Sequence, residues 1–142
     1  MKIHKGRLID HLHLRVTRLA DSRRFYSACL GALGLSIGRD TDTYFTFDEL
    51  FVSEADGTPV SRVHLAFQAS SEAKVAAFHR AALDAGGADN GKPGPRAYHP
   101  GYYAAYAFDP DGNNIEAVFH GPMMRSADSI VFTPPRSVTP CP

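Results

Sequence analysis

The chain contains no tryptophan, only two cysteines and no excess of charge of either sign. Its 15 basic and 15 acidic residues form no basic block that could follow a phosphate backbone, so nucleic acid is not an expected partner. No apolar run approaches the ~20 residues that a bilayer-spanning helix needs, and the polar segment Met1–Arg7 lacks the apolar centre of a signal peptide. We therefore expect a cytoplasmic protein that does not interact with membranes.

The length and the two cysteines point to one compact intracellular domain. A chain of 142 residues with 44% hydrophobic content is long enough to bury a core. Cys29 falls in a helical pattern and Cys141 near the end of the chain, so we expect free thiols and no disulfide framework. Five of the ten prolines lie from Pro122 onward, which predicts that residues 122–142 form an extended or disordered tail outside the domain.

A strand with a histidine-rich face is predicted near the N-terminus. Residues 8–16 alternate polar and apolar side chains, the pattern of a strand with one buried face. This alternation places His11, His13 and Arg15 together on the opposite face.

A helix and two more strands are predicted to follow. The helix has apolar residues at helical spacing between a cap at Thr17 or Asp21 and a stop at Gly34. Residues 43–47 and 50–53 are rich in aromatic and β-branched side chains, which favours strands.

The same order of elements then returns, which indicates an internal duplication. Residues 62–68 alternate again, and a second helix follows with a cap at Ser70 or Ser71 and a glycine pair at its end. Aligned at an interval of 53 residues (64 − 11), the two copies pair His64 with His11 and also match several apolar positions and the helix stop. The predicted modules span about residues 7–57 and 62–121.

The last part of the second copy contains a hairpin with an unusual carboxylate. Residues 89–96, rich in glycine and proline, are expected to form a flexible loop, and residues 103–119 two strands around a turn at 109–114. Glu116 lies among apolar residues of the second strand. Its side chain either points to water, or is buried and paired with a cation or metal, since a lone buried carboxylate is costly.

Two equivalent histidines and one strand carboxylate form a candidate metal site. His11, His64 and Glu116 supply the two imidazoles and one carboxylate that hold a divalent transition metal while leaving positions open. The competing interpretation is that each histidine only serves the core or the surface, as most strand histidines do. The recurrence of the histidine at the same place in both copies favours the metal.

The chain resembles the vicinal oxygen chelate superfamily, which contains glyoxalase I enzymes, extradiol dioxygenases, fosfomycin-resistance thiol transferases and bleomycin-binding proteins. The resemblance covers about residues 8–121, and the hairpin is its most specific part. It implies an α+β fold in which two tandem βαβββ modules form a cupped mixed sheet, and a small-molecule substrate chelated through two neighbouring oxygens. The motifs that carry it are residues 9–16 (IDHLHLRV), 22–26 (SRRFY), 30–35 (LGALGL), 63–67 (VHLAF) and 108–116 (FDPDGNNIE).

The resemblance also implies the metal ligands. His11, His64 and Glu116 match the family's ligand positions, and the metal would be iron, manganese, zinc or nickel. His13 departs from the commonest pattern and is either a partner that orients a ligand or a rival ligand.

One ligand of the glyoxalase I branch has no clear counterpart. That branch places a glutamate in the last strand of the first module, where this chain has residues 50–53, and Glu49 and Glu54 only flank that strand. Two histidines and one glutamate suit iron in dioxygenases or manganese in the fosfomycin group. We therefore expect little turnover of the methylglyoxal–glutathione adduct.

Residues just before the hairpin are candidates for substrate contact. His99, Tyr102 and Tyr103 lie on a loop punctuated by proline and glycine, with His99 and Tyr103 considered as catalytic groups beside Glu116. The alternative is that these side chains only pack the loop. Arg15 shares the face of His11 and is a candidate for meeting an anionic substrate, although the more common explanation is an arginine that is simply exposed.

Two functional classes remain from the sequence. One is a divalent-metal-dependent enzyme of dioxygenase, thiol transferase or lyase type. The other is a metal-free binding protein of the bleomycin-resistance type. The resemblance further implies a homodimer, in which one metal draws His11 and Glu116 from different subunits.

Overall fold

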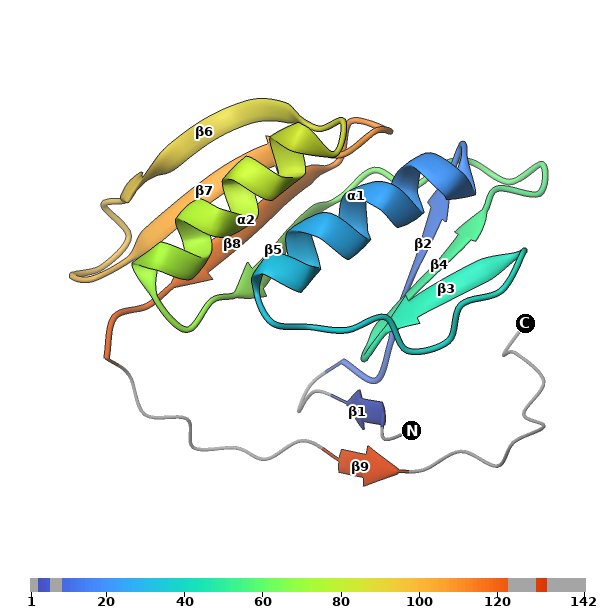
Figure 1. The fold of residues 1–142 in the computed structure, drawn as a ribbon, viewed down its shortest axis with the longest axis horizontal. Helices are drawn as coiled ribbons and strands as arrows, with labels where there is room; N and C mark the ends of the chain where they lie inside the picture. The colour runs from blue at the N-terminus through green and yellow to red at the C-terminus, as the bar shows by residue number, and fades with distance from the viewer. Residues whose placement is uncertain (1–2, 6–8, 123–129, 133–142) are drawn as a thin grey trace.

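Two βαβββ modules, each with one helix packed on one face of its sheet, make up the body of the molecule (Figure 1). The structure is a computed structural model that describes residues 3–5, 9–122 and 130–132. The α+β fold of two tandem modules predicted from the duplication is confirmed.

The first module forms a three-stranded sheet. Its strand order is β2-β4-β3, with β2 parallel to β4 and β3 antiparallel to β4. The remaining strand of the module is reduced to a single bridge between Asp40 and Phe45. The elements are β2 (Leu12–Val16), α1 (Leu19–Ala32), β3 (Tyr44–Phe47) and β4 (Leu50–Glu54).

The second module forms a four-stranded sheet in the order β5-β8-β7-β6, with β5 parallel to β8. The prediction of a flexible loop at residues 89–96 is wrong. That segment is largely strand β6, which pairs with β7 through register shifts around Gly91 and Gly94, so glycine and proline there mark an irregular edge strand. The elements are β5 (His64–Gln68), α2 (Glu72–Asp84), β6 (Ala88–Pro95), β7 (Tyr103–Phe108) and β8 (Asn114–Phe119).

The helix starts were predicted with mixed success. In α2 the Ser71 side chain accepts a hydrogen bond from the backbone N–H of Lys74, which confirms one of the two expected caps. The N-cap position of α1 is Arg18, and its side chain makes no cap bond, so the cap expected at Thr17 or Asp21 is wrong. Asp111 of the second module instead accepts from the backbone N–H of Thr17, at 3.1 and 3.2 Å from its two oxygens.

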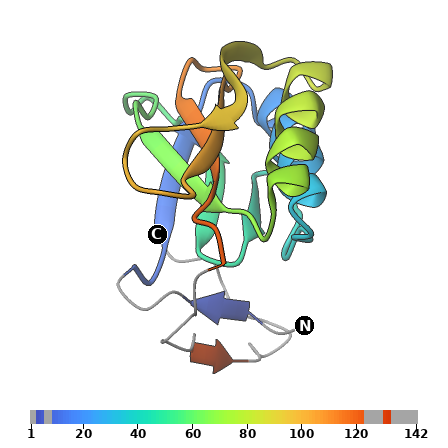
Figure 2. The same ribbon diagram turned by 90° about the vertical axis from the view of Figure 1, so that its left-hand side faces the viewer.

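Both helices lie on the same side of the two sheets (Figure 2). Strand alternation sends apolar side chains of both modules, such as Leu14 and Ile115, toward α1 and α2, where they are fully buried. The face of each sheet turned away from the helices is called here the helix-free face. It carries His13 and Phe51 in the first module, and His64 and Glu116 in the second.

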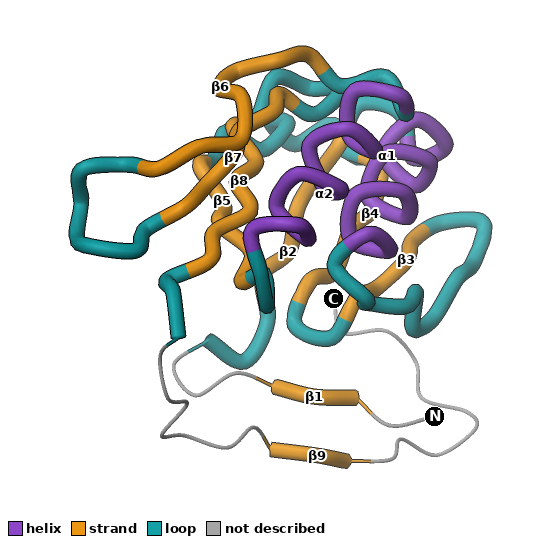
Figure 3. The backbone as a smooth tube through the Cα atoms, turned by 60° about the vertical axis from the view of Figure 1, so that its left-hand side comes forward, coloured by secondary structure: helices purple, strands orange, loops and turns teal. Residues whose placement is uncertain are grey.

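The two ends of the chain contribute one further pair of strands. Strand β1 (Ile3–Lys5) pairs antiparallel with β9 (Ile130–Phe132), side by side in Figure 3. The rest of the predicted tail beyond Pro122 lies outside the described residues, and so does Cys141. Cys29 is a buried free thiol, as predicted. Within the described residues no helix is long and apolar enough to cross a membrane.

Candidate functional site

Glu116 is the centre of the candidate site. It lies on β8, between β5 and β7, where its neighbours Ile115 and Ala117 point into the core. Its own side chain lies on the helix-free face, yet the residue is only 2% exposed. The water-facing alternative is therefore wrong, and polar partners must offset the desolvation of this carboxyl group.

Two side chains bond the two oxygens of Glu116 separately. The Tyr102 hydroxyl donates to Oε1 at 2.6 Å. The Nε2 atom of His64 lies 2.8 Å from Oε2, and the His64 side chain is 54% exposed. One carboxyl oxygen is thus held by a phenol, while the other faces an imidazole that is open to solvent.

A second tyrosine lies directly across the ladder from Glu116. Tyr106 of β7 is its register partner and also lies 6.0 Å, ring to ring, from His64. Burial, followed by the bond to the Glu116 carboxyl, raises the pKa of Tyr102. Burial and the charge of Glu116 likewise raise the pKa of Tyr106, so both phenols remain protonated at neutral pH.

The His64–Glu116 pair fits two-point attachment of a metal. Ligand bonds of about 2.0–2.2 Å allow two donors separated by up to roughly 4 Å to share one ion, and 2.8 Å is within that limit. Among the described residues of a single chain, no three His, Cys, Asp or Glu side chains gather closely enough to hold a metal. Within one chain, a metal at this place would therefore have these two described side chains as ligands.

His11, the third predicted ligand, lies apart from this pair. It directly precedes β2, and its Nδ1 atom lies 2.7 Å from Oδ1 of Asp10, with the imidazole 48% exposed. His64 is the first residue of β5, and His11 lies one residue before β2. The two equivalent histidines therefore sit at nearly the same place at the start of the first strand of each module. The structure brings together two of the three predicted ligands.

His13 belongs to an aromatic group on the helix-free face of the first module. Its Nε2 atom lies 2.8 Å from the Ser53 hydroxyl, and its ring meets Phe51 edge-on at 4.7 Å. Phe51 in turn stacks on Tyr44 at 4.9 Å. Burial, then the charges of Arg15 and His11, lowers the pKa of His13, which favours a neutral ring at neutral pH.

The strand registers identify the counterpart of Glu116 in the first module. In the second module β8 places Glu116 opposite Ala66 of β5. In the first module β4 places Phe51 opposite His13, the residue equivalent to Ala66 at the interval of 53 residues. Phe51 therefore stands where a second carboxylate would stand.

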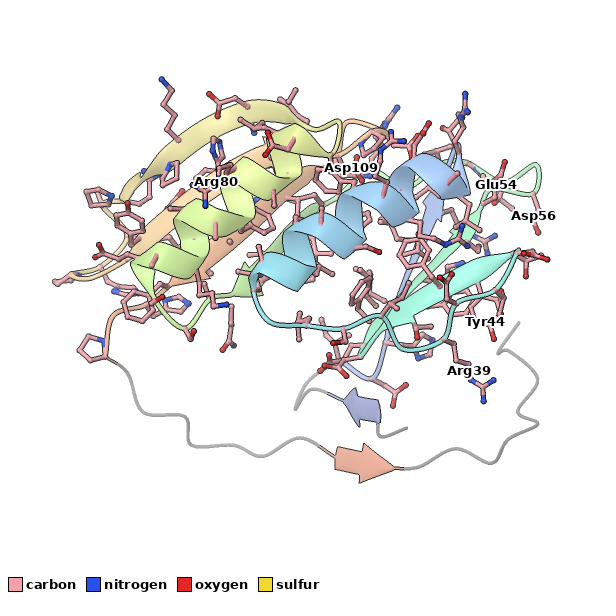
Figure 4. The ribbon with its side chains drawn as sticks, viewed as in Figure 1. Arg39, Tyr44, Glu54, Asp56, Arg80 and Asp109 are labelled. Atoms are coloured by element: carbon pink, nitrogen blue, oxygen red, sulfur yellow. The ribbon has the colours of Figure 1, made fainter. Side chains whose placement is uncertain are left out.

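The two flanking glutamates are not at that position. Glu49 precedes β4 in the turn after β3, and Glu54 ends β4 opposite Val16. Figure 4 shows Glu54 near Asp56 at the far end of this strand. The expectation that neither glutamate is in register is supported by this pairing.

The remaining predicted site residues have protein partners of their own. Arg15 donates to Asp56 at 3.2 Å and to Thr58 at 3.1 Å. His99 lies 3.0 Å from Nδ1 of His120, and Tyr103 starts β7 opposite Phe119.

Sequence reasoning missed His120, Tyr106 and Phe51 as members of the site. Tyr106 and Phe51 were detectable only by strand register. His120 had no signal beyond its place one residue after β8.

The family model that describes the sequences of the glyoxalase/bleomycin resistance protein/dioxygenase superfamily matches residues 8–117 of this chain. The chain belongs to this superfamily. The match includes both modules and all three predicted metal ligands. Among curated proteins, none matches the sequence.

Solved structures of superfamily members share the fold. A glyoxalase/bleomycin resistance protein from Albidiferax ferrireducens T118 is 32% identical, with a TM-score of 0.68, over 76% of this chain and 95% of that one. A glyoxalase-related enzyme from Fulvimarina pelagi is 20% identical, with a TM-score of 0.65, over 90% and 99%. A variant of glyoxalase I from Zea mays is 20% identical, with a TM-score of 0.57, over 83% of this chain but 44% of that one. The last two similarities show the fold alone.

Proposed function

We propose that the protein is a divalent-metal-dependent enzyme that acts on a small molecule carrying two neighbouring oxygen atoms. The observation that carries the proposal is the buried Glu116 carboxyl group with its Oε2 atom 2.8 Å from the accessible His64 imidazole. This pair offers an anionic oxygen and a ring nitrogen at one point of the helix-free face, which suits iron, manganese, zinc or nickel.

The third ligand in this proposal is His11 of a second copy of the chain. His11 is exposed and lies at the first-module position equivalent to His64. A two-fold dimer that places the first module of one subunit against the second module of the other would build two identical sites. Each site would then combine His64 and Glu116 of one subunit with His11 of its partner.

The residues of the chain have distinct roles in this site. A bound metal would act as a Lewis acid that polarises an oxygen of the substrate. Tyr102 holds Oε1 of Glu116, which leaves Oε2 as the oxygen that faces His64. Phe51, in place of a second carboxylate, removes a base from the first-module side and favours a dioxygenase or an oxirane-opening transferase over glyoxalase-type isomerisation.

Metal titration of the chelator-treated protein tests the proposal. Calorimetry with Mn²⁺, Zn²⁺ and Ni²⁺, and with Fe²⁺ under anaerobic conditions, should detect one site per chain. Glu116→Gln and His64→Gln should each abolish that site, and Glu72→Gln, which changes an exposed carboxylate in the first turn of α2, should leave it intact. Absence of binding to the wild type would overturn the proposal and favour a metal-free binding protein.

A further inference from the structure

The hydroxyl of Tyr102 reaches Glu116 from a loop. Tyr102 directly precedes β7, 14 positions before Glu116, and its bond to Oε1 at 2.6 Å is shorter than the 2.8 Å between Oε2 and His64. A loop side chain loses conformational entropy when it is fixed in one place, so other contacts must hold Tyr102 there.

Three aromatic rings surround the ring of Tyr102. His99 and His120 each meet it edge-on, with centroids 5.2 Å away, and Tyr98 lies at 4.9 Å. Edge-to-face contacts at these distances are favourable and depend on orientation. The phenol ring is therefore held between a residue of its own loop and a residue that follows β8.

The two histidines are themselves bonded to each other. Nδ1 of His99 lies 2.9 Å from the carbonyl oxygen of Pro100, so this nitrogen carries the proton and donates. Nε2 of His99 lies 3.0 Å from Nδ1 of His120, a hydrogen-bonding distance, with the two rings tilted by only 19°. This hydrogen bond joins the β6–β7 loop to the chain that leaves β8.

Two glycines permit the approach of these segments. Gly101 and Gly121 have φ values of 85° and 80°, which L side chains rarely adopt. A Cβ atom on Gly101 would lie 3.6 Å from the Cα of Gly121 and 3.5 Å from the carbonyl oxygen of His120. The backbones at Gly101 and Gly121 therefore lie against each other beside the His99–His120 pair. This close backbone approach fixes the distance between the two histidines.

We infer that Tyr102 is a positioning residue for Glu116, and that the His99–His120 pair holds Tyr102 in that position. His99 in this arrangement acts through Tyr102 and supports the carboxyl group from a distance. The inference deepens the proposed function, because it states how this chain presents one oxygen of Glu116 to a metal while holding the other.

Metal affinity provides the first test. Residues that orient a metal ligand typically change affinity by about 10–100-fold when they are replaced. We expect Tyr102→Phe, which removes only the hydroxyl, to weaken Zn²⁺ and Mn²⁺ binding within that range, and His120→Ala to weaken it in the same direction. Glu72→Gln, which changes an exposed carboxylate in the first turn of α2, should bind like the wild type.

The double variant separates a positioning role from general damage. If His120 acts through Tyr102, adding His120→Ala to Tyr102→Phe should weaken binding by no more than about twofold further. Additive losses, or an unchanged affinity in Tyr102→Phe when Glu116→Gln abolishes binding, would overturn the inference.

Hydrogen exchange of the metal-free protein gives an independent readout. We expect the backbone amides of residues 97–103 to exchange faster in His120→Ala and Tyr102→Phe, and no faster in the double variant than in the more affected single variant. If the wild type binds no metal, the proposed function fails and this measurement alone decides the inference. Unchanged exchange in both single variants would then reject it.

Discussion

Glu116 and Phe51 occupy equivalent positions in the two modules but have opposite chemistry. The carboxyl group of Glu116 is bonded by Tyr102 and His64, whereas the ring of Phe51 stacks on Tyr44. The duplicated fold therefore supports an asymmetric site, with one polar half that presents a carboxyl group and an imidazole, and one aromatic half. A single residue, Phe51, accounts for the difference in charge at these two positions.

Replacing Phe51 should change the chemistry of the site. Phe51→Glu would put a carboxylate beside His13, and we expect Zn²⁺ affinity to rise by about tenfold, or roughly 1.4 kcal/mol. Phe51→Gln introduces a side chain of the same shape as glutamate but without its charge, so the Zn²⁺ affinity of this variant should show no such rise. Equal affinities for the two variants in calorimetry would contradict the assignment of Phe51 to the ligand position.

The wild type should also be a poor glyoxalase. We expect turnover of the methylglyoxal–glutathione adduct well below about 1 per second, because no carboxylate stands at the first-module position to act as a base. The assay is run with nickel, zinc, manganese and iron supplied separately. Turnover at enzyme-like rates with any of them would mean that Glu49 or Glu54 reaches the site.

At the scale of elements, the β7–β8 turn is joined to α1 through a buried carboxyl group. Asp109 is 4% exposed and accepts from the Tyr26 hydroxyl at 2.7 Å and from the Asn113 side chain at 2.9 Å. Backbone amides of Asp111 and Asn113 bond its other oxygen at 3.0 and 2.8 Å. The turn that places Glu116 on β8 is thus tied to the first module.

Removing one hydroxyl tests this connection. Tyr26→Phe leaves the ring in the core but deletes a bond to a buried carboxylate, so we expect the free energy of unfolding to fall by about 2 kcal/mol. Tyr98→Phe, at a residue that is 74% exposed, should change it little. Urea unfolding of both variants measures the difference, and equal midpoints would show that the bond contributes nothing.

The start of β6 has a pH-dependent contact. The backbone N–H of Gly91, and then His79, lowers the pKa of Asp89. Because the folded value is the lower one, the contribution of Asp89 is present above its unfolded pKa of about 3.9 and is lost as the pH falls through the folded value. Between pH 6 and pH 3 the wild type should therefore lose more stability in urea unfolding than Asp89→Asn, and parallel losses would contradict this.

The sequence predicted the elements better than it predicted their contacts. The interval of 53 residues that aligns His11 with His64 also separates the first residues of α1 and α2, Leu19 and Glu72, because each module carries its own hydrophobic pattern and glycine stop. Strand β6 was missed because its glycines and prolines are typical of loops, and edge strands tolerate them.

Contacts between distant segments were beyond the reach of the sequence. His64 was singled out by the duplication and Glu116 by its place among apolar strand residues, but the bond from Tyr102 depends on how the loop before β7 folds back. The pairing of His99 with His120 depends on left-handed glycines at two separate loops. Such contacts arise from register and backbone geometry, and residue type alone does not specify them.

At the scale of the whole molecule, both helices cover the same side of the two sheets, so the helix-free faces of the two modules are turned to the same side of the molecule (Figure 2). His64 and Glu116 meet on one of these faces, and His11 lies just before the first strand of the other. A dimer would bring the two halves together from different subunits. Light scattering at micromolar concentration should give about twice the chain mass of 15.4 kDa, and a particle of the single-chain mass alone would count against the dimer.

Mixing two variants that each lack a metal ligand tests most directly whether the site is shared between two subunits. His11→Gln and Glu116→Gln should each bind no metal as pure dimers. After unfolding and refolding together, random pairing gives about half heterodimers, each with one intact site, so binding should return to about a quarter of the wild-type capacity. If all three ligands came from one chain, no heterodimer would contain an intact site, and a mixture that binds no metal would contradict the shared site.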